Sequence, residues 1–290
     1  MDEAVEKLLT ALDLERIEEN LYRGISPDQN WQRVFGGQVV AQALVAAQRT
    51  IVTERSVNSL HCYFMWPGDP AVPIVYRVER LRDGGSFSTR RTDAIQHGRT
   101  IFTMTASFQQ DEAGLEHQID MPAVPDPDDL PSMSEIQADA LKSAPEPIQR
   151  YWARPRPVEF RPVGLERYLN RKDAVPLQHI WVRLKAPVAD DRALGAAVLA
   201  YISDMTLLDT ALFAHGLSVF DRRLQVASLD HAMWFHHPAS ANEWMLYAQD
   251  SPASSGGRGL ARGSLFSRQG RLIASMAQEG LIRPRQDQSA

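Results

Sequence analysis

Residues 98–104 read Gly98-Arg99-Thr100-Ile101-Phe102-Thr103-Met104, and residues 270–276, 172 positions later, read Gly270-Arg271-Leu272-Ile273-Ala274-Ser275-Met276. Four of the seven residues are identical. Ser59-Leu60 returns as Ser228-Leu229 after 169 positions, in the same order along the chain. Two matches at nearly equal spacing predict an internal duplication, and a repeat of this length decides the fold class.

Each half combines one apolar helix with several short strands. In the first half, the run at 39–47 follows Gly36-Gly37 and is apolar almost all round, which predicts a buried helix. Four segments rich in aromatic and β-branched residues follow, separated by turn residues, and predict an antiparallel meander. These segments are residues 60–66, 74–81, 86–95 and 100–108. A buried helix followed by such a meander indicates an α+β unit with its sheet wrapped around the helix.

The second half repeats this order. Strands at 158–161 and 179–184 precede an apolar helical region at 193–213. A second meander is then expected at 225–235, 243–249, 258–266 and 271–279.

The domain organisation follows from this repetition. We expect a first unit at 1–112, opened by an amphipathic helix over 3–21, and a second unit at 157–290. Residues 113–156 are rich in proline and acidic residues and predict a linker, with a short helix near 134–142.

Composition narrows the functional classes. The chain has 290 residues, a formal net charge of −5 and 44% hydrophobic residues, so it has no basic footprint for nucleic acid. Its single cysteine, Cys62, excludes an intrachain disulfide and multi-cysteine metal sites. The acidic start lacks a signal-peptide core, and no apolar run is long enough to span a membrane. We therefore expect a cytoplasmic protein that associates with neither nucleic acid nor membrane.

Motifs of several enzyme classes are missing. The sequence has no Gly-x-Ser-x-Gly elbow, Walker loop, strand-coupled dinucleotide fingerprint or His-Glu-x-x-His. His236 and His237 are adjacent on an expected strand and point to opposite faces, so no metal site is expected. The glycines at 256–259 join two strands and are interpreted as a plain loop.

Three polar residues of the second half stand out as candidate catalytic groups. Asp204 lies inside the apolar helical region, where a carboxylate needs a partner or a chemical role. Gln278 stands in the last strand where the first copy has Ala106, and Ser228 opens the strand equivalent to that of Ser59. A structural interpretation stays open at this point, with Asp204 as a helix cap, Ser228 as a strand-end hydroxyl and Gln278 as an edge residue.

Two further reactive side chains have structural interpretations. His231, beside Asp230, is the competing base but is interpreted as a hydrogen-bonded structural histidine. Cys62 has no evident activating cation and is interpreted as a core residue.

Longer motifs resemble those of the bacterial acyl-CoA thioesterase II family, the double-hotdog thioesterases. The matching stretches of the first half are residues 8–21, 34–40, 81–88 and 104–109, and those of the second half are residues 227–236 and 278–280. The resemblance covers nearly the whole chain and is weakest in the linker. It implies an α+β double hotdog, two tandem helix-wrapped antiparallel sheets that arise from internal duplication.

The resemblance also implies a site and a reaction. In that family an Asp, a Ser or Thr and a Gln converge on one water. By motif position, these residues correspond to Asp204, Ser228 and Gln278. The implied reaction is hydrolysis of medium- to long-chain acyl-CoA to free fatty acid and CoA, with no metal or organic cofactor. A homo-oligomer, a dimer or tetramer of double-hotdog chains, is implied as well.

The residue types suit this chemistry. A thioester is already activated, so the water needs orientation and a proton acceptor, and partial burial raises the pKa of Asp204 toward a useful range. Gln278 and a backbone N–H at a helix start are expected to polarise the carbonyl. Since no histidine is placed by motif to activate Ser228, we expect single displacement without an acyl-enzyme.

Candidate substrate-binding residues fall into two groups. An apolar tunnel between helix and sheet is expected to hold the acyl chain, lined near Met233 and Trp234. The candidates for binding the CoA phosphates, each with a surface charge as the alternative, are Arg258, Arg262 and Arg271.

Two other functions are compatible with a hotdog fold. An enoyl-CoA hydratase would need an Asp-x-Asn-Pro-x-His motif, which the sequence lacks. A non-catalytic acyl-CoA-binding module would tolerate the loss of Asp204 or Gln278, so the presence of both argues against it.

Overall fold

The structure is a computed structural model that describes residues 2–27, 32–51, 54–133, 135–136, 155–164, 175–219 and 221–285. The elements up to the linker are α1 (Glu3–Leu12), β1 (Glu15–Glu18), β2 (Leu21–Gly24), α2 (Gly36–Gln48), β3 (Arg55–Phe64), β4 (Ile74–Asp83), β5 (Phe87–Gln96), β6 (Arg99–Gln110) and the 3-10 turn η1 (Pro127–Asp129). The later elements are β7 (Val158–Pro162), β8 (Leu177–Leu184), α6 (Arg192–Ser203), α7 (Asp209–Phe213), β9 (Leu224–Ser228), β10 (Asp230–Phe235), β11 (Met245–Ser255), β12 (Arg258–Ser267) and β13 (Leu272–Pro284).

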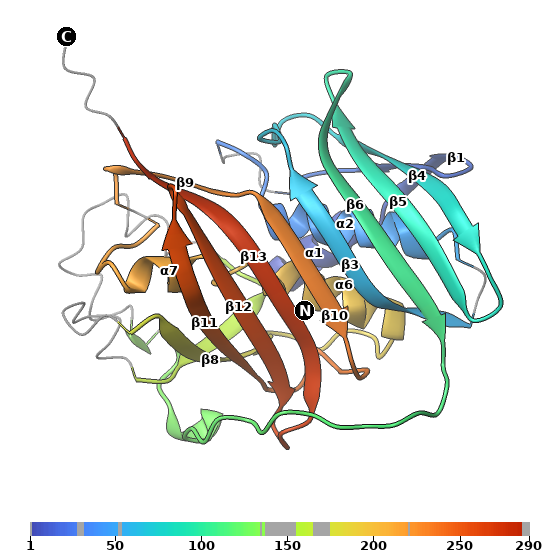
Figure 1. The fold of residues 1–290 in the computed structure, drawn as a ribbon. Coiled ribbons are helices and arrows are strands. Elements are labelled where there is room, and N and C mark those ends of the chain that lie inside the picture. The colour runs from blue at the N-terminus through green and yellow to red at the C-terminus, as the bar shows by residue number, and fades with distance from the viewer. Residues whose placement is uncertain are drawn as a thin grey trace, which may run out of the picture.

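The described strands form one continuous antiparallel sheet in the order β1-β2-β4-β5-β6-β3-β10-β13-β12-β11-β8-β7, with β9 also paired to β13 (Figure 1). The order on one side of the β3–β10 seam mirrors the order on the other side. At the seam, Ser59 pairs with Trp234 and Tyr63 with Asp230. The two sheets of the duplicated units are therefore joined edge to edge, as the double-hotdog prediction requires.

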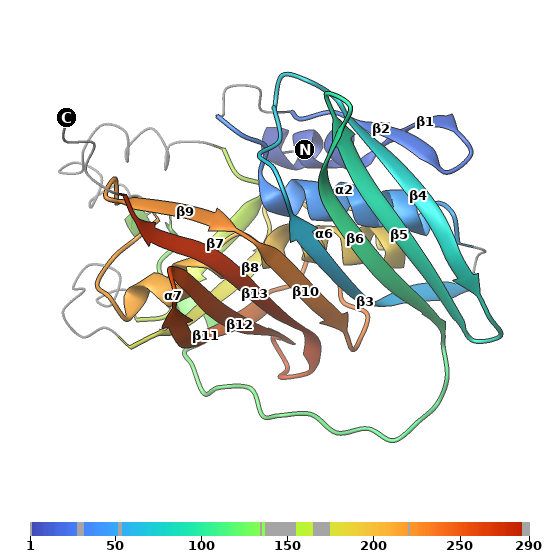
Figure 2. The ribbon, with the colours of Figure 1, turned by 45° about the horizontal axis from the view of Figure 1, so that its top comes forward.

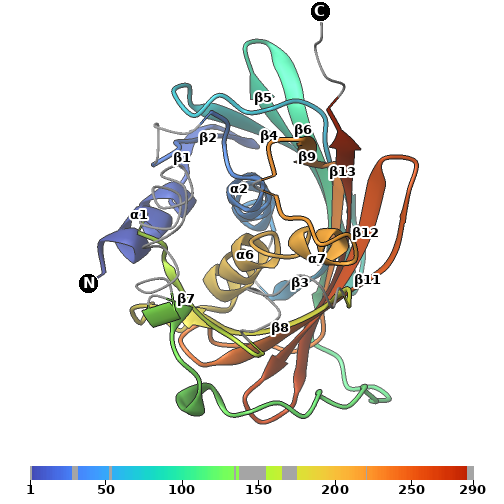
Figure 3. The same cartoon turned by 90° about the vertical axis from the view of Figure 1, so that its left-hand side faces the viewer.

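The helices α2 and α6 lie together on the concave side of this curved sheet (Figures 2 and 3). They run antiparallel, because Gln48 at the end of α2 donates to the backbone oxygen of Ala193 at the start of α6. At the other end of the pair, Gly37 at the start of α2 packs on the backbone of Tyr201 near the end of α6. One hydrophobic core runs through both units, from Val40 and Leu44 of α2 to Val198 and Ile202 of α6.

A buried polar network explains the glutamine within the apolar helix α2. The side chain of Gln42 is fully buried and donates to the backbone oxygens of Ala11 and Ile25 at 2.7 and 3.0 Å. It accepts a hydrogen bond of 2.7 Å from the hydroxyl of Tyr76. The network ties α1, α2 and β4 together, and each buried polar group within it has a partner.

The predicted opening helix is wrong beyond Leu12. Asp13 ends α1, and the segment that follows forms the hairpin β1–β2, with Glu15 paired to Arg23. Asn20 has a φ of 60° at the turn, a backbone conformation that asparagine tolerates better than most residues. The helical interpretation placed Ile17 on the apolar face of the helix, but this residue is 47% exposed on the hairpin.

Two other predicted elements are interrupted. The helical region predicted at 193–213 divides into α6 and α7, with a turn at 204–208 between them. The strand predicted at 225–235 divides into β9 and β10 at Leu229, whose N–H donates to the backbone oxygen of Glu279. Both interruptions occur next to candidate catalytic residues.

The described part of the linker is not a free tether. Met121, Val124 and Leu130 cover a second hydrophobic cluster on the outer face of the second sheet, which includes Trp181. The indole N–H of Trp181 donates to the backbone oxygen of Pro125 at 3.0 Å. The helix predicted near 134–142 lies largely outside the described residues, and the unit boundaries at 112 and 157 remain predictions.

Two observations complete the fold. Cys62 is a free thiol that is 2% exposed, so it is a core residue as predicted. Within the described ranges, no helix is both long and apolar enough to cross a membrane.

Candidate functional site

Asp204, Ser228 and Gln278 lie together. Asp204 follows the last residue of α6 as its C-cap, Ser228 ends β9, and Gln278 lies within β13. The amide Nε2 of Gln278 donates to Oδ1 of Asp204 at 2.5 Å, and the Ser228 hydroxyl donates to the same oxygen at 3.4 Å. The structure thus brings together three residues that span 75 positions of the sequence.

A glycine on β13 allows this approach. Gly280 pairs with Ser228 across the β9–β13 ladder. A Cβ at Gly280 would lie 2.3 Å from Cδ1 of Leu208, which belongs to the turn after α6. Because Gly280 has no side chain, that turn packs directly on the sheet and holds Asp204 over the end of β9.

The start of α2, from the first unit, supplies another donor to the carboxylate. The backbone N–H of Gly37 bonds to Asp204, and a Cβ at Gly36 would lie only 2.6 Å from Oδ2 of Asp204. The N-cap residue Phe35 makes no side-chain hydrogen bond, so no side chain of the cap competes for the N–H groups of the first turn. The positive end of the α2 dipole also faces the carboxylate.

The two glycines are the functional residues that sequence reasoning missed. In the sequence, Gly36-Gly37 only precedes a predicted buried helix, and the expected donor is an N–H at an unspecified helix start. The available signal was a glycine pair at a helix start without a Ser, Thr, Asp or Asn cap. Its contact with Asp204 could not be read from local spacing, because the two residues belong to different halves of the chain.

Burial tunes the candidate base. Desolvation raises the pKa of Asp204 from 3.8 to about 6, while hydrogen bonds from Gln278, Gly37 and Ser228 and the charge of Arg33 oppose this rise. Gln278 is fully buried, and its Oε1 has no hydrogen-bond partner among the described residues. The site therefore holds one carboxylate that is mostly ionised at neutral pH, next to one uncommitted amide oxygen.

His231, which stands beside Asp230 in the sequence, belongs to the buried packing of the second unit. Its ring is 1% exposed, and Nε2 lies 2.9 Å from the hydroxyl of Ser203. Burial lowers the pKa of His231 to about 4, so the imidazole is neutral at physiological pH. These contacts agree with its interpretation as a structural histidine.

The structure separates the two apolar residues proposed for the acyl tunnel. Met233 is fully buried and belongs to the core on the helix side of β10. Trp234 is 38% exposed on the opposite face, where its ring packs edge-on against His61 at 5.2 Å. Only Met233 lies on the side of the sheet that carries Asp204.

The three candidate phosphate-binding arginines are on or near exposed surface. Arg258 pairs with Glu279 at 3.0 Å, and Arg262 pairs with Asp250 at 2.6 Å. Arg271 is exposed at the start of β13. Within the described residues, none of these three arginines contacts Asp204.

Metal-binding side chains do not gather in the described part of the chain. No group of three or more His, Cys, Asp or Glu residues there could hold a metal ion. His236 is exposed, and its Nε2 lies 2.9 Å from the hydroxyl of Ser275.

Family models and known proteins match nearly the whole chain. The model for the acyl-CoA thioesterase N-terminal domain matches residues 26–109, and the acyl-CoA thioesterase model matches residues 152–281. Acyl-CoA thioesterase 2 of Haemophilus influenzae is 41% identical over 283 residues, which cover 98% of this chain and 99% of the relative.

Solved structures agree with these matches. An acyl-CoA thioesterase II from Mycobacterium marinum is 42% identical, covers 97% of this chain and 99% of its own, and superimposes with a TM-score of 0.78. A hotdog-fold protein of unknown function from Alicyclobacillus acidocaldarius has a TM-score of 0.76 at 20% identity, covering 96% of this chain and 98% of its own, and supports the fold alone.

The raised pKa of Asp204 predicts a pH-dependent stability change in Asp204→Asn. The folded-state pKa of about 6 exceeds the unfolded value of 3.8, so the carboxylate costs stability as pH rises through this window. After allowance for lost hydrogen bonds, we expect Asp204→Asn to stabilise the fold by about 1–2 kcal/mol at pH 8 and by much less at pH 4.5. Thermal and urea unfolding at both pH values measure this.

The matched control is Asp190→Asn, at an exposed position in the loop before α6. It should change stability little at either pH. A pH-independent effect of Asp204→Asn would contradict the desolvated state of the carboxylate.

Proposed function

The chain belongs to the acyl-CoA thioesterase family and is therefore a thioester hydrolase, and from this premise we propose that Asp204, Ser228 and Gln278 hold the water that attacks the thioester. The observation that carries the proposal is the convergence of Gln278 Nε2, Ser228 Oγ and the Gly37 N–H on the Asp204 carboxylate. A carboxylate with a pKa of about 6 is ionised at neutral pH and basic enough to accept a proton.

Two groups of the site are suited to orient the water. Oε1 of Gln278 has no partner among the described residues and is an available acceptor for one water hydrogen. Asp204 accepts the other. The Ser228 bond to Asp204 is long at 3.4 Å, so its hydroxyl can rotate to donate to the water oxygen.

The reaction then proceeds by single displacement. The water oxygen attacks the carbonyl carbon while Asp204 takes a proton from the water. The positive end of the α2 dipole stabilises the negative charge that develops on the carbonyl oxygen. The carbon–sulfur bond breaks, the thiolate leaves, and it receives the proton that Asp204 holds, which restores the carboxylate.

The acyl chain is proposed to lie on the helix side of the sheet. Phe64 packs against Gly36 beside Asp204, and Met233 lines the same side of the seam. We propose medium- to long-chain acyl groups as substrates, because this layer between α2, α6 and the sheet is apolar.

The coenzyme phosphates need a cation at the surface near this layer. Arg258 and Arg262 are neutralised by ion pairs that phosphate binding would have to break. Arg33 acts electrostatically on Asp204 and donates to the backbone oxygen of Val226, so we propose it as the cation nearest the mouth of the site.

The proposed role of Asp204 predicts the pH profile of hydrolysis. Thiol release from acyl-CoAs with four to eighteen carbons gives the chain-length range. For the best substrate, kcat/KM should rise with pH through about 6 and then level off, because only the ionised carboxylate accepts a proton. Asp204→Asn should lower kcat by about a hundredfold or more and remove this pH dependence.

Several results would overturn this mechanism or the activity. Undiminished turnover in a folded Asp204→Asn protein would remove Asp204 from it. An acyl-Ser228 adduct in mass spectrometry would replace single displacement with covalent catalysis. If no chain length is hydrolysed but acyl-CoA raises the melting temperature, the protein is a binding module.

The close approach of Gly36 to Asp204 predicts a second loss of activity. In Gly36→Ala the new Cβ would lie 2.6 Å from Oδ2, so the carboxylate has to move away from the water. We expect kcat to fall about tenfold to a hundredfold while the far-ultraviolet circular dichroism stays unchanged. Gly85→Ala is the matched control, because a Cβ there meets no atom within 4 Å. Equal activity of both variants would contradict the tight α2–Asp204 contact.

We also propose that two copies of the chain associate through the outer face of the β3–β10 seam. Trp234 and Tyr63 are 38% and 61% exposed there, and exposed aromatic residues that gather on one face commonly mark interfaces. Trp234→Lys should lower the molar mass measured by light scattering after size exclusion. Ile17→Lys, on the edge strand β1, should not. An unchanged mass for both variants would exclude this face as the interface.

A further inference from the structure

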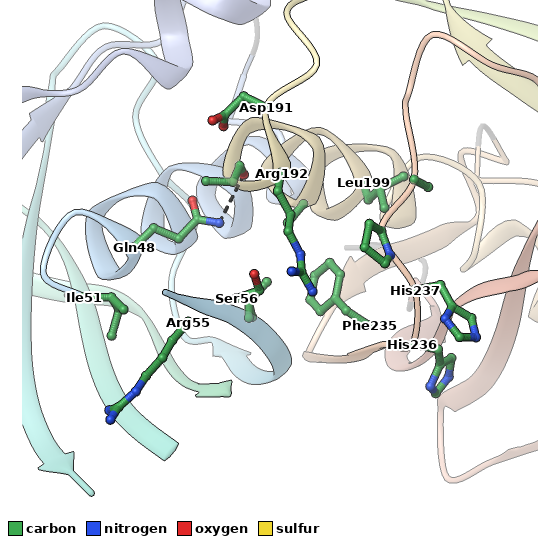
Figure 4. Close-up of a pocket in the computed structure, with 15 residues that line it drawn as sticks. Gln48, Ile51, Arg55, Ser56, Asp191, Arg192, Leu199, Phe235, His236 and His237 are labelled. Atoms are coloured by element: carbon green, nitrogen blue, oxygen red, sulfur yellow. Dashed lines mark hydrogen bonds between the residues drawn. The ribbon is translucent and has the colours of Figure 1, made fainter. Parts of the chain in front are cut away.

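A cavity lies at the opposite end of the α2–α6 pair from Asp204. It has a volume of about 420 Å³, within the range of about 300–1,000 Å³ usual for small-molecule sites. Figure 4 shows the end of α2, the start of α6, the start of β3 and the end of β10 around it. The lining residues that matter here are Gln48, Val57, Arg192, Ala196, Leu199 and Phe235.

This cavity is the counterpart of the catalytic centre under the internal two-fold symmetry of the chain. The catalytic centre lies where the start of α2 meets the end of α6, beside the end of β3 at Phe64 and the start of β10. The cavity lies where the start of α6 meets the end of α2, beside the start of β3 and the end of β10. Exchanging the two units therefore exchanges the two locations.

The chemistry at the two locations differs. At the end of α2 stands Gln48, whose Nε2 donates to the backbone oxygen of Ala193 at 3.1 Å, whereas the end of α6 carries Asp204. Ala106 takes the place of Gln278 in the duplicated strand. Asp191, which also lines the cavity, accepts from the N–H of Leu194 as the cap of α6. The cavity thus has an apolar wall that includes Val57, Leu199 and Phe235, and it lacks counterparts of Asp204 and Gln278. His236 and His237 line its far side (Figure 4).

At the rim of the cavity, Arg192 forms an ion pair that a ligand can displace. The side chain of Arg192 extends from α6 over the cavity, whereas that of Arg55 points away from it (Figure 4). The guanidinium of Arg192 pairs with Asp111 at 2.6 Å, and their side chains are 45% and 72% exposed. An exposed pair of this kind contributes little stability, so a ligand carboxylate can replace Asp111 at small cost.

We propose that this cavity binds a fatty acyl chain without hydrolysing it, with a carboxylate head group on Arg192. Val57, Leu199 and Phe235 contact the chain, and a free fatty acid is the form that supplies the carboxylate. The choice of a fatty acid as ligand rests on the proposed function, because a fatty acid is the product of that reaction. An acyl-CoA molecule bound at this cavity would present the same acyl chain with a different head group. Bound product would leave the catalytic centre open for the next substrate.

A photoreactive fatty acid with a diazirine in its chain tests the proposal on the full-length protein. After irradiation, peptide mapping should find label on residues 193–199 and 235–239, at the cavity. Unlabelled fatty acid should compete for this label, whereas competition by a non-hydrolysable thioether analogue of acyl-CoA alone would identify acyl-CoA as the occupant of the same site. Label confined to peptides around Asp204 and Ser228 would overturn the proposal.

Two variants sharpen the test. Ala196→Leu fills the cavity from α6 and should abolish its labelling while hydrolysis continues, which also shows that the variant folds. Asp111→Asn frees the guanidinium of Arg192 and should tighten fatty acid binding about threefold to tenfold, as a surface change that does not touch the core. Labelling that persists in Ala196→Leu, or fatty acid affinity unchanged in Asp111→Asn, counts against the site.

Thiol release measured on the same preparations separates the two proposals. Active protein that takes label only at the catalytic centre leaves the thioesterase mechanism intact and removes the second site. Protein that binds the probe at the cavity but hydrolyses no acyl-CoA retains the second site and removes the mechanism.

Discussion

The site depends on a carboxylate held at the negative end of a helix. Asp204 follows the last turn of α6, where the unpaired carbonyls already disfavour negative charge, and its surroundings desolvate it further. The compensation comes from the other unit, because α2 runs antiparallel to α6 and directs the N–H of Gly37 at the same carboxylate. The antiparallel pairing of the two central helices therefore builds the proposed site as well as the core.

The continuous sheet fixes this pairing. The β3–β10 ladder sets the two units in one register, and each helix packs on the concave side of the shared sheet. A slip of two residues at this seam would move one helix along the other by about 7 Å, since strands rise by about 3.3 Å per residue. Such a slip would separate Gly37 from Asp204. The strand pairing that closes the core thus also controls the distance between donor and carboxylate.

Much of this arrangement can be predicted from the sequence, for reasons that are local. The run at 39–47 is apolar on all faces, so only a buried helix suits it, and the turn residues between β-branched segments mark the strands. Asp204 and Gln278 could be singled out because polar groups in apolar elements need partners. The triad itself came from motif resemblance, and the structure supplies its hydrogen bonds.

The predictions that were wrong or missing concern features that the local sequence pattern does not decide. Residues 15–18 suit either a helix or a short strand, and pairing with Arg23 and its neighbours selects the hairpin. Trp234 follows Met233 directly, so alternation on a strand sends one of them outward, and sequence alone did not say which. Gly37 contributes a backbone N–H across more than 160 positions, a contact that no side-chain pattern records.

Duplication within one chain explains why the two ends of the helix pair differ. In a symmetric dimer of identical units, a carboxylate at one end requires the same carboxylate at the other. With a folded-state pKa of about 6, each such group costs at most about 3 kcal/mol at neutral pH, a large fraction of the stability of a typical domain. In this chain the end of α2 carries the neutral Gln48, and Ala106 stands where Gln278 stands in the other unit. Covalent linkage of the units therefore allows the electrostatic cost of a buried carboxylate to arise at one end of the helix pair only.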